Sequence, residues 1–430
     1  MSDPAARTLQ DWLSWQESLH LSAIDLGLDR IAVVAGRMGL LAPAFPVITV
    51  AGTNGKGSTT ALLTSILHTS GYRVGTYTSP HILRYNERVA LDGQPVADEL
   101  LCAAFTAIDA ARLDVSLTYF EFGTLAAMWV FTQHQVDVAV LEVGLGGRLD
   151  ASNLWDADVA VITAIGIDHV EWLGDNREDI GREKAGIARA GKALICGDPH
   201  PPASIAATAA LIGAQLLQNG VDFRVEPLPE GRFSIHLQPA FGREGLAWLG
   251  LPRPVLQGDV QMNNAACAVL AVQQLVNRLP LSGRQALEDG IRLATLPGRL
   301  QKIQSRPDVW VDVAHNPHAA ENLAEWLQKS PVAGKTYVIF SILADKDITG
   351  VIKPLLPHVD EWHFFPLVSP RAASLPVIQA ALDACHVQHP VSSPDLQHAW
   401  AQLAGHLQAE DRVVIFGSFL VVSKMLDGIF

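Results

Sequence analysis

The sequence predicts an α/β protein whose first part is built on a mostly parallel sheet and whose second part is a smaller α/β domain. Three observations support this prediction. An apolar, β-prone run at 45–50 leads through a glycine-rich turn into a helix pattern that reaches 67. Apolar runs at 136–141 and 158–163 each end in polar residues, as strands covered on both faces do. After a break at 296–299, strand and helix patterns alternate again.

Length and composition indicate a well-packed globular protein. A chain of 430 residues corresponds to about two or three domains, and we expect the division 1–296 and 297–430. The net charge of −13 and the lack of a Lys/Arg block argue against a nucleic-acid surface. No apolar run reaches membrane length, and residues 1–4 lack the basic start of a secretory leader. We therefore expect no membrane partner.

The cysteines and the helix patterns predict the compartment and the assembly. Cysteines stand at positions 102, 196, 267 and 385, far apart and in apolar surroundings. This spacing is typical of reduced core residues and predicts a cytoplasmic protein. No long apolar helix face is evident, so a monomer is expected.

The expected elements follow in chain order. Helices are predicted within 8–43, at 98–111 and at 122–133, and further helices begin near Asp179 and Gln261. Gly71 is expected to end the helix at 61–67 in a left-handed conformation. Strands are predicted at 45–50, 73–78, 136–141, 158–163, 193–196 and 233–237, and in the second part at 309–313, 336–340, 361–365 and 412–416.

The turn after the first strand predicts a phosphate-binding loop. It contains Thr53, Asn54, Gly55, Lys56, Gly57 and Ser58. Backbone N–H groups at a helix start favour anions, and Lys56 can reach the outer phosphates. A hydroxyl at Ser58 or Thr59 can help to hold Mg²⁺. The pattern departs from the common loop motif because Gly57 separates the lysine from the hydroxyl.

Polar residues also follow three other predicted strands. Ser79 follows the strand at 73–78, Glu142 ends the strand at 136–141, and His169 comes after the strand at 158–163. In a parallel sheet these residues share one edge with the phosphate loop. A carboxylate at this edge is typical of Mg²⁺-dependent nucleotide enzymes, whereas His169 alone is more typical of a packed histidine.

Several further residues allow two interpretations. Gly27 marks either a turn or a ligand-binding loop within 24–28. Lys184 lies on a predicted helix, where a solvated surface lysine is the ordinary case. Asn264 is either a helix cap or a ligand-binding amide. Asp312 and His315 stand where a strand of the second domain ends, which is again the ligand edge.

An ordered set of motifs spanning nearly the whole chain resembles a known family. The motifs are Ala-Gly-Thr-Asn-Gly-Lys-Gly-Ser at 51–58, Thr-Ser-Pro-His at 78–81, Glu-Val-Gly-Leu-Gly-Gly-Arg-Leu-Asp at 142–150, Asp-His at 168–169, Arg-Glu-Lys-Ala-Gly at 182–186, Pro-Gly-Arg at 297–299 and Asp-Val-Ala-His-Asn-Pro at 312–317. They resemble the folylpolyglutamate synthases of the Mur ligase superfamily. The segments 24–28 and 117–121 are similar to the bacterial bifunctional type, dihydrofolate synthase plus folylpolyglutamate synthase.

This resemblance implies a fold and a reaction. It implies an N-terminal nucleotide-binding domain, a C-terminal domain similar in topology to dihydrofolate reductase, and an active site between them. The implied reaction joins L-glutamate to dihydropteroate, and to reduced folates, at the expense of ATP. The substrate carboxylate becomes an acyl phosphate, and the amine of glutamate displaces the phosphate.

The resemblance also implies roles for individual residues. Ser79 and Glu142 would hold one Mg²⁺, His169 a second, and Lys184 would carry a carbamate; K⁺ is a further candidate ion. Asn264, Arg299 and Asp312 would contact ATP, and His315 would lie near the reaction centre or the nucleotide. The implied dihydropteroate pocket consists of Asp25, Leu26, Gly27 and Leu28, then Thr118, Tyr119, Phe120 and Glu121, then Leu149, Asp150 and Ala151. In it, Phe120 would stack on the pterin and Asp150 would accept its ring N–H groups. Ser418 and the segment 345–347 are candidates for binding glutamate.

Two other functions remain open on the sequence. One is a ligase of the same superfamily that acts on another acid, such as a cell-wall precursor, or on folylpolyglutamate alone. The other is a P-loop NTPase switch whose hydrolysis drives a partner. A ligase releases phosphate only when acceptor and glutamate are both present, and a switch releases it without glutamate.

Overall fold

The computed structural model describes residues 7–20, 22, 24–238, 248–280 and 283–428. The prediction made on residues 1–4 lies outside this range. The chain divides into two compact units. The first contains the described residues up to Ile165 together with His169–Val255 and Gln261–Thr295, and the second contains Gly166–Asp168, Leu256–Val260 and the described residues from Leu296 onward. The predicted functional domains, 1–296 and 297–430, stay a prediction.

The first unit is built on an eight-stranded sheet. The strands run in the order β4 (Gln94–Pro95), β3 (Val89–Leu91), β2 (Val74–Tyr77), β5 (Val138–Glu142), β1 (Val47–Ala51), β6 (Val159–Ile162), β7 (Ala193–Cys196) and β8 (Gln215–Gln218). In this order, the neighbouring strands from β2 across to β8 pair parallel, whereas the pairs β2–β3 and β3–β4 are antiparallel. The predicted mostly parallel sheet is therefore confirmed.

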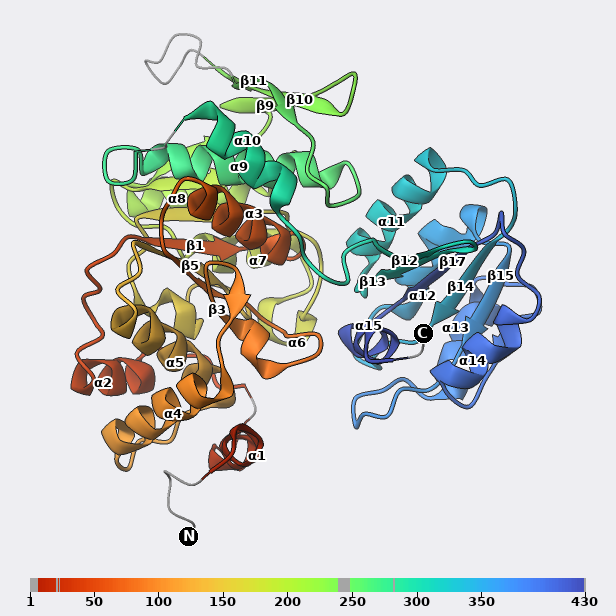
Figure 1. Ribbon diagram of the computed structural model, residues 1–430, viewed down its shortest axis with the longest axis horizontal. Helices are drawn as coiled ribbons and strands as arrows, with labels where there is room; N and C mark the ends of the chain where they lie inside the picture. The colour runs from red at the N-terminus through yellow and green to blue at the C-terminus, as the bar shows by residue number, and fades with distance from the viewer. Residues whose placement is uncertain (1–6, 21, 23, 239–247, 281–282, 429–430) are drawn as a thin grey trace. The chain divides into compact units, whose positions relative to one another are not determined.

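Helices cover both faces of this sheet (Figure 1). Successive strand side chains point to opposite faces, so a continuously apolar strand supplies two cores. Ile48 and Val50 of β1 pack with α3 (Lys56–Thr69), α9 (Val260–Gln274) and α10 (Arg284–Leu293). Val47 packs on the other face with α2 (Asp29–Arg37), α4 (Asp98–Arg112) and α5 (Tyr119–Gln133).

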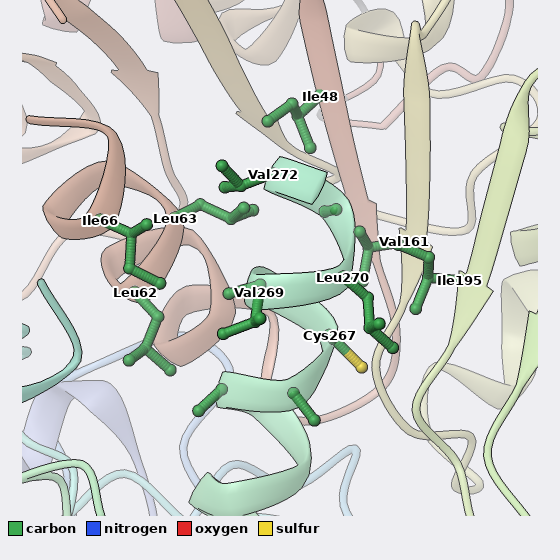
Figure 2. Packing of buried hydrophobic residues seen from close by; sticks show 14 of the residues in the cluster. Ile48, Leu62, Leu63, Ile66, Val161, Ile195, Cys267, Val269, Leu270 and Val272 are labelled. Carbon is green, nitrogen blue, oxygen red and sulfur yellow. The ribbon is translucent and has the colours of Figure 1, made fainter. Parts of the chain in front are cut away.

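Among the helices that pack with Ile48 and Val50, helix α9 is the most enclosed. Its residues from Ala265 to Val272 are all buried, because the helix packs both on α3 and on the sheet. Figure 2 shows this packing, with Leu62, Leu63 and Ile66 of α3 on one side and Ile48, Val161 and Ile195 on the other. A helix that is apolar all round must be enclosed in this way.

Other elements complete the first unit. They are the helices α1 (Leu9–Leu19), α6 (Val170–Leu173), α7 (Arg177–Ala185) and α8 (Ala203–Ile212), and the short 3₁₀ helices η2 (Tyr85–Arg88) and η3 (Ala151–Leu154). A separate antiparallel sheet contains β9 (Phe223–Leu228), β10 (Arg232–Leu237) and β11 (Trp248–Pro252).

The second unit contains a six-stranded sheet. Its order is β12 (Gln301–Ser305), β13 (Asp308–Asp312), β17 (Arg412–Phe416), β14 (Thr336–Phe340), β15 (Glu361–Phe364) and β16 (Val391–Ser392), parallel except for β12. Its helical elements are α11 (Pro317–Lys329), α12 (Ile348–Ile352), η5 (Lys353–His358), α13 (Leu375–Ala384), α14 (Leu396–Ala404) and α15 (Phe419–Leu426). Among the described residues, no helix is long and apolar enough to cross a membrane.

Close packing of α10 on α3 generates a stability prediction. A Cβ atom added at Gly290 of α10 would lie 2.5 Å from the Ile66 Cα of α3, a backbone atom that cannot move aside alone. We expect Gly290→Ala to lower the free energy of unfolding by about 1–3 kcal/mol, measured by urea denaturation.

The matched control for this substitution is Gly36→Ala. Gly36 is an exposed glycine in α2, where the nearest atom to an added Cβ is the Leu41 Cδ1 at 3.4 Å. The control should stabilise the protein by about 0.4–1 kcal/mol, since alanine lowers the entropy of the unfolded chain. Equal effects of the two substitutions would contradict the packing argument.

Candidate functional site

The phosphate loop joins β1 to α3, as predicted. Gly55 caps the start of α3 with a positive φ of 89°. A Cβ there would lie 2.7 Å from the Asn264 Oδ1, so both the backbone angle and the neighbouring helix require glycine. Lys56 is the first residue of α3, and its Nζ donates to the carbonyl oxygens of Gly52 at 2.9 Å and Thr53 at 3.3 Å. The ammonium therefore already lies folded over the loop.

Asn264 lies inside a helix and does not cap one. Helix α9 begins at Val260, so the interpretation of Asn264 as a cap is wrong. The sequence predicted a start near Gln261, one residue after the observed start, and three of the four residues from Gln261 to Asn264 are buried. The Asn264 Nδ2 donates to Gln261 Oε1 at 2.9 Å, which aims the amide at Gly55.

Both candidate hydroxyls lie deep in the loop. Ser58 is 2% exposed and Thr59 is fully buried. Among the described residues, Thr59 Oγ1 has no hydrogen-bond partner. The geometry therefore does not choose between Ser58 and Thr59 as the hydroxyl that helps to hold Mg²⁺.

Four adjacent parallel strands bring the predicted polar residues to one sheet edge. Their order is β2, β5, β1 and β6, so the segments carrying Ser79, Glu142, the phosphate loop and His169 leave the sheet side by side. The Ser79 N–H donates to Glu142 Oε2 at 3.3 Å, and Glu142 is 4% exposed. His169 is exposed and starts α6 with a positive φ of 53°.

This donor set fits a hard divalent cation. Carboxylate and hydroxyl oxygens suit Mg²⁺ and Mn²⁺. Glu142 supplies the carboxylate and Ser79 the hydroxyl, and the Ser79 backbone N–H donates to that carboxylate at the strand ends. Within the described ranges, no cluster of three or more His, Cys, Asp or Glu side chains forms a metal site. A metal at this edge would take the Glu142 carboxylate and the Ser79 hydroxyl as oxygen ligands, with phosphate or water as further ligands.

His81 lies two residues after Ser79 and is held by a neighbouring cation. The Arg88 Nε donates to the His81 Nδ1 at 2.9 Å. Burial, with the Arg88 charge adding to it, lowers the pKa of His81 from 6.5 to about 4. Glu87 shapes the same loop by accepting from the N–H groups of Ile82, Leu83 and Arg84.

Asp150 organises the second glycine-rich loop. Its Oδ2 accepts from the N–H groups of Gly144 at 3.1 Å and Leu145 at 2.9 Å, and its Oδ1 accepts from the N–H and hydroxyl of Ser152. A carboxylate has about four lone-pair positions, so these four donors occupy nearly all of them. Burial raises the pKa of Asp150, opposed by these hydrogen bonds. The geometry favours a structural role, so a direct contact between Asp150 and a pterin stays a prediction.

Lys184 is buried beside the same loop. It is 4% exposed, so the ordinary expectation of a solvated lysine is wrong. The helix α7 turns this residue inward because the loop docks on its last turn. A Cβ at Gly147 would lie 2.9 Å from the Lys184 Cα, and the Arg148 N–H donates to the Glu183 carbonyl at 3.0 Å.

The three segments of the predicted pterin pocket meet in space. The Gly27 N–H donates to the Leu149 carbonyl at 3.2 Å, which joins the first segment to the third. The Phe120 ring lies against Gly144, where a Cβ would approach it to 2.7 Å, and joins the second segment to the glycine-rich loop. Gly27 therefore belongs to a loop that contacts other predicted ligand segments, beyond a simple turn.

In the second unit, Asp312 ties the end of β13 to the segment before β12. Its two oxygens accept from the N–H groups of Leu300 and Ala314, both at 2.7 Å. Burial raises the pKa of Asp312, and the Arg299 guanidinium opposes that change. Arg299 itself lies over the Phe419 ring, 5.1 Å from its centre.

His315 belongs to a polar cluster around Asp168. The His315 Nε2 lies 3.4 Å from one Asp168 oxygen, and the Asn316 Nδ2 donates to the same oxygen at 3.0 Å. The Lys346 Nζ pairs with the other oxygen at 2.6 Å. Lys346 was predicted only as a glutamate candidate, and its pairing with Asp168 was missed because the two residues are 178 positions apart.

Two glutamate candidates have structural partners. The Ser418 hydroxyl accepts from the Leu420 N–H and caps α15. Asp347 caps α12 by accepting from the Gly350 N–H at 2.9 Å. Neither contact identifies a glutamate site, and both candidates stay predictions.

Comparison with known proteins agrees with this fold. Residues 50–200 match the Mur ligase middle domain, and residues 298–419 match the Mur ligase glutamate ligase domain. The class of protein is thus a Mur ligase. The dihydrofolate synthase/folylpolyglutamate synthase of Escherichia coli (strain K12) is 45% identical over 423 residues, 98% of this chain and 96% of the relative.

Solved structures narrow the class. A structure of E. coli FolC in complex with DHPP and ADP has a TM-score of 0.91 at 43% identity, covering 99% of this chain and 98% of that chain. A bifunctional folylpolyglutamate synthase/dihydrofolate synthase with Mn, AMPPNP and L-glutamate bound has a TM-score of 0.90 at 42% identity, covering 99% of both chains. The chain belongs to the dihydrofolate synthase/folylpolyglutamate synthase family.

The lowered pKa of His81 generates a pH prediction. Between pH 6.5 and about 4, the unfolded chain binds a proton at this histidine and the folded chain does not, so stability falls as the pH falls through this window. We expect His81→Gln to remove part of that loss, because glutamine cannot be protonated. The measurement is the free energy of unfolding by urea at pH 7 and pH 5.

The control is His134→Gln, which changes an exposed histidine after α5. The control should keep the wild-type difference between the two pH values. A wild-type difference in the His81 variant would contradict the lowered pKa.

Proposed function

We propose that this chain is an ATP-dependent ligase that joins L-glutamate to dihydropteroate and to reduced folates. The two activities are those of a dihydrofolate synthase and a tetrahydrofolate synthase/folylpolyglutamate synthase. The observation that carries the proposal is the shared sheet edge, where a phosphate loop and a serine–carboxylate pair leave adjacent strands. The names of the closely similar relatives support the choice of substrates.

The chemistry requires cations at this edge. A substrate carboxylate must attack a triphosphate, and the two anions repel each other. Lys56, Thr53, Asn54, Gly55, Gly57 and Ser58 would bind the ATP phosphates, with Asn264, Arg299 and Asp312 as further nucleotide contacts. Ser79, Glu142 and His169 would hold divalent metal, which supplies charge neutralisation when it is bound. We propose two Mg²⁺ ions, with K⁺ as a further candidate.

The acceptor would bind at the three joined segments. The Gly27 to Leu149 hydrogen bond joins the segments 25–28 and 149–151, and the Phe120 ring of the segment 118–121 lies against Gly144 of the glycine-rich loop. Phe120 offers a half-buried aromatic face at this place, suited to stacking on a pterin. We propose His315 as a group near the reacting carboxylate, and a monomer in the cytoplasm as the working form.

An acceptor assay tests the function. Purified protein with ATP and Mg²⁺ should release phosphate only when L-glutamate and an acceptor are both present. Dihydropteroate and tetrahydrofolate should each serve as acceptor. Phosphate release that ignores glutamate would favour an NTPase switch, and activity with tetrahydrofolate alone would favour a folylpolyglutamate synthase.

The charged groups at the sheet edge generate a kinetic prediction. Lys56→Ala and Glu142→Ala should each lower kcat by about 10²-fold or more, the scale for one electrostatic group acting on developing charge. Circular dichroism should show an unchanged fold. The control is Lys192→Ala, which removes an exposed lysine that pairs with Asp158 at 2.9 Å, and it should keep wild-type kcat. Near-normal activity of Glu142→Ala with Mg²⁺ would rule out its proposed role.

We propose further that Lys184 carries a carbamate. A buried ammonium beside metal cations would repel them, by kcal/mol even at an effective dielectric of about 20. A carbamate reverses the charge and supplies oxygen atoms. The burial of Lys184 supports this proposal, because a side chain that is only 4% exposed would hold a carbamate in a fixed position.

The carbamate generates a chemical prediction. Lys184→Ala should lose activity, and a short carboxylic acid added to this variant should restore part of it. A crystal structure at saturating bicarbonate should show a planar carboxyl group on the Nζ atom. A bare amine in an active preparation with metal bound would exclude the carbamate.

A further inference from the structure

Arg30 links two of the three segments of the proposed acceptor pocket. It lies in the first turn of α2, directly after the segment 25–28. Its NH1 pairs with the Asp25 Oδ2 at 2.7 Å, and its NH2 donates to the Asp25 carbonyl at 2.7 Å. The same NH2 lies 3.3 Å from the Glu121 Oε1. A planar guanidinium can make these contacts at once, and an ammonium cannot.

Glu121 makes the Arg30 contact important for the second segment. Its side chain is 3% exposed, and its Oε2 accepts from the Thr118 N–H at 2.7 Å in a capping box at the start of α5. The other oxygen, Oε1, has no hydrogen-bond partner among the residues that the structure describes. Arg30 therefore places its positive charge beside this buried carboxylate oxygen. A buried carboxylate that loses its cationic partner is strongly destabilising.

His20 supports the same arrangement from the end of α1. Its Nε2 lies 3.1 Å from the Asp25 Oδ2, and its Nδ1 lies 2.6 Å from the Ser116 hydroxyl. Ser116 stands two residues before Thr118, where the second segment begins. The Asp25 carboxylate is thus held between Arg30 and His20, and both of these lead to the segment at 118–121.

We infer that Arg30 is a positioning residue for the pterin acceptor, setting the segment 25–28 against the start of α5. This inference rests on the proposed function, and it adds a residue outside the three segments themselves. Arg30 acts through Asp25 and Glu121. Loss of the Arg30 charge should release the segment 25–28 and should leave the buried Glu121 carboxylate without its arginine partner. The phosphate loop should keep its contacts.

The experiment measures acceptor and nucleotide KM values separately. We expect Arg30→Gln to raise the KM for dihydropteroate about tenfold or more, the scale of a lost charged hydrogen bond, and to leave the KM for ATP within about twofold. The matched control is Arg37→Gln on the same helix. Arg37 donates to the carbonyls of Ala111 at 3.2 Å and Arg112 at 2.8 Å, away from the pocket segments, and both KM values should stay at wild-type levels.

A double-mutant cycle with Glu121→Gln tests the route of the effect. Glutamine at 121 can still accept from the Thr118 N–H but carries no charge. If Arg30 acts through Glu121, the combined rise in KM for dihydropteroate will be smaller than the product of the two single rises. Thermal unfolding of each variant shows whether the fold is kept.

The outcomes separate the inference from the function. A wild-type KM for dihydropteroate in Arg30→Gln, or an equal rise in both KM values, would overturn the positioning role. If Arg30→Gln does not fold, Arg30→Lys is measured in its place. Lysine keeps the positive charge but cannot reproduce the planar set of N–H donors of the guanidinium. A raised KM for dihydropteroate then supports the inference, and an unchanged one overturns it. Wild-type protein inactive with dihydropteroate would instead overturn the proposed function.

Discussion

The close approach of Asn264 to Gly55 is the constraint on which the predicted phosphate loop depends. A loop that binds phosphate through backbone N–H groups needs a left-handed residue before its helix, and Gly55 provides it with a φ of 89°. Asn264 closes the remaining space, 2.7 Å from where a Cβ would be. Asn264 can lie there because its helix, α9, is enclosed between α3 and the sheet (Figure 2). Core packing and the phosphate loop are therefore one arrangement, in which a displaced α9 would displace the loop.

Buried strands were the part of the fold that the sequence predicted best. The strands at 193–196, 336–340 and 412–416 have the predicted bounds, because both faces are covered and the apolar run ends where the strand ends. The edge strand β12 was not predicted. Its sequence, Gln301 to Ser305, is polar and only partly buried, so its pairing with β13 leaves no hydrophobic signal. The common edge of Ser79, Glu142 and the phosphate loop followed from strand ends alone.

The contacts that shape the site were not predictable in the same way. The Ser116 hydroxyl meets His20 across 96 residues, and Lys346 meets Asp168 across 178. No periodicity marks either pair, because each member is a polar residue in a loop or at a helix end. Asp150 shows a second limit of prediction from the sequence. The family resemblance implied that Asp150 accepts the ring N–H groups of a pterin, and this stays a prediction. In the structure its oxygens accept from N–H groups of the glycine-rich loop and of Ser152, and from the Ser152 hydroxyl. The amino-acid type indicated the chemistry, and the backbone decided the partner.

The glycine-rich loop and helix α7 together explain why a lysine is buried where oxygen ligands are expected. A Cβ at Gly147 would meet the Glu183 carbonyl oxygen at 2.8 Å, and one at Gly186 would meet the Arg148 Cβ at 2.5 Å, so small residues on both sides allow this approach. The Asn153 Nδ2 then ties the two segments by donating to the carbonyls of Arg148 and Gly186. Lys184 is enclosed by this docking. Two glycines are required for the close packing that buries this lysine, which is not expected for an ordinary surface lysine. The docking gives Lys184 a fixed position, which the proposed carbamate would require.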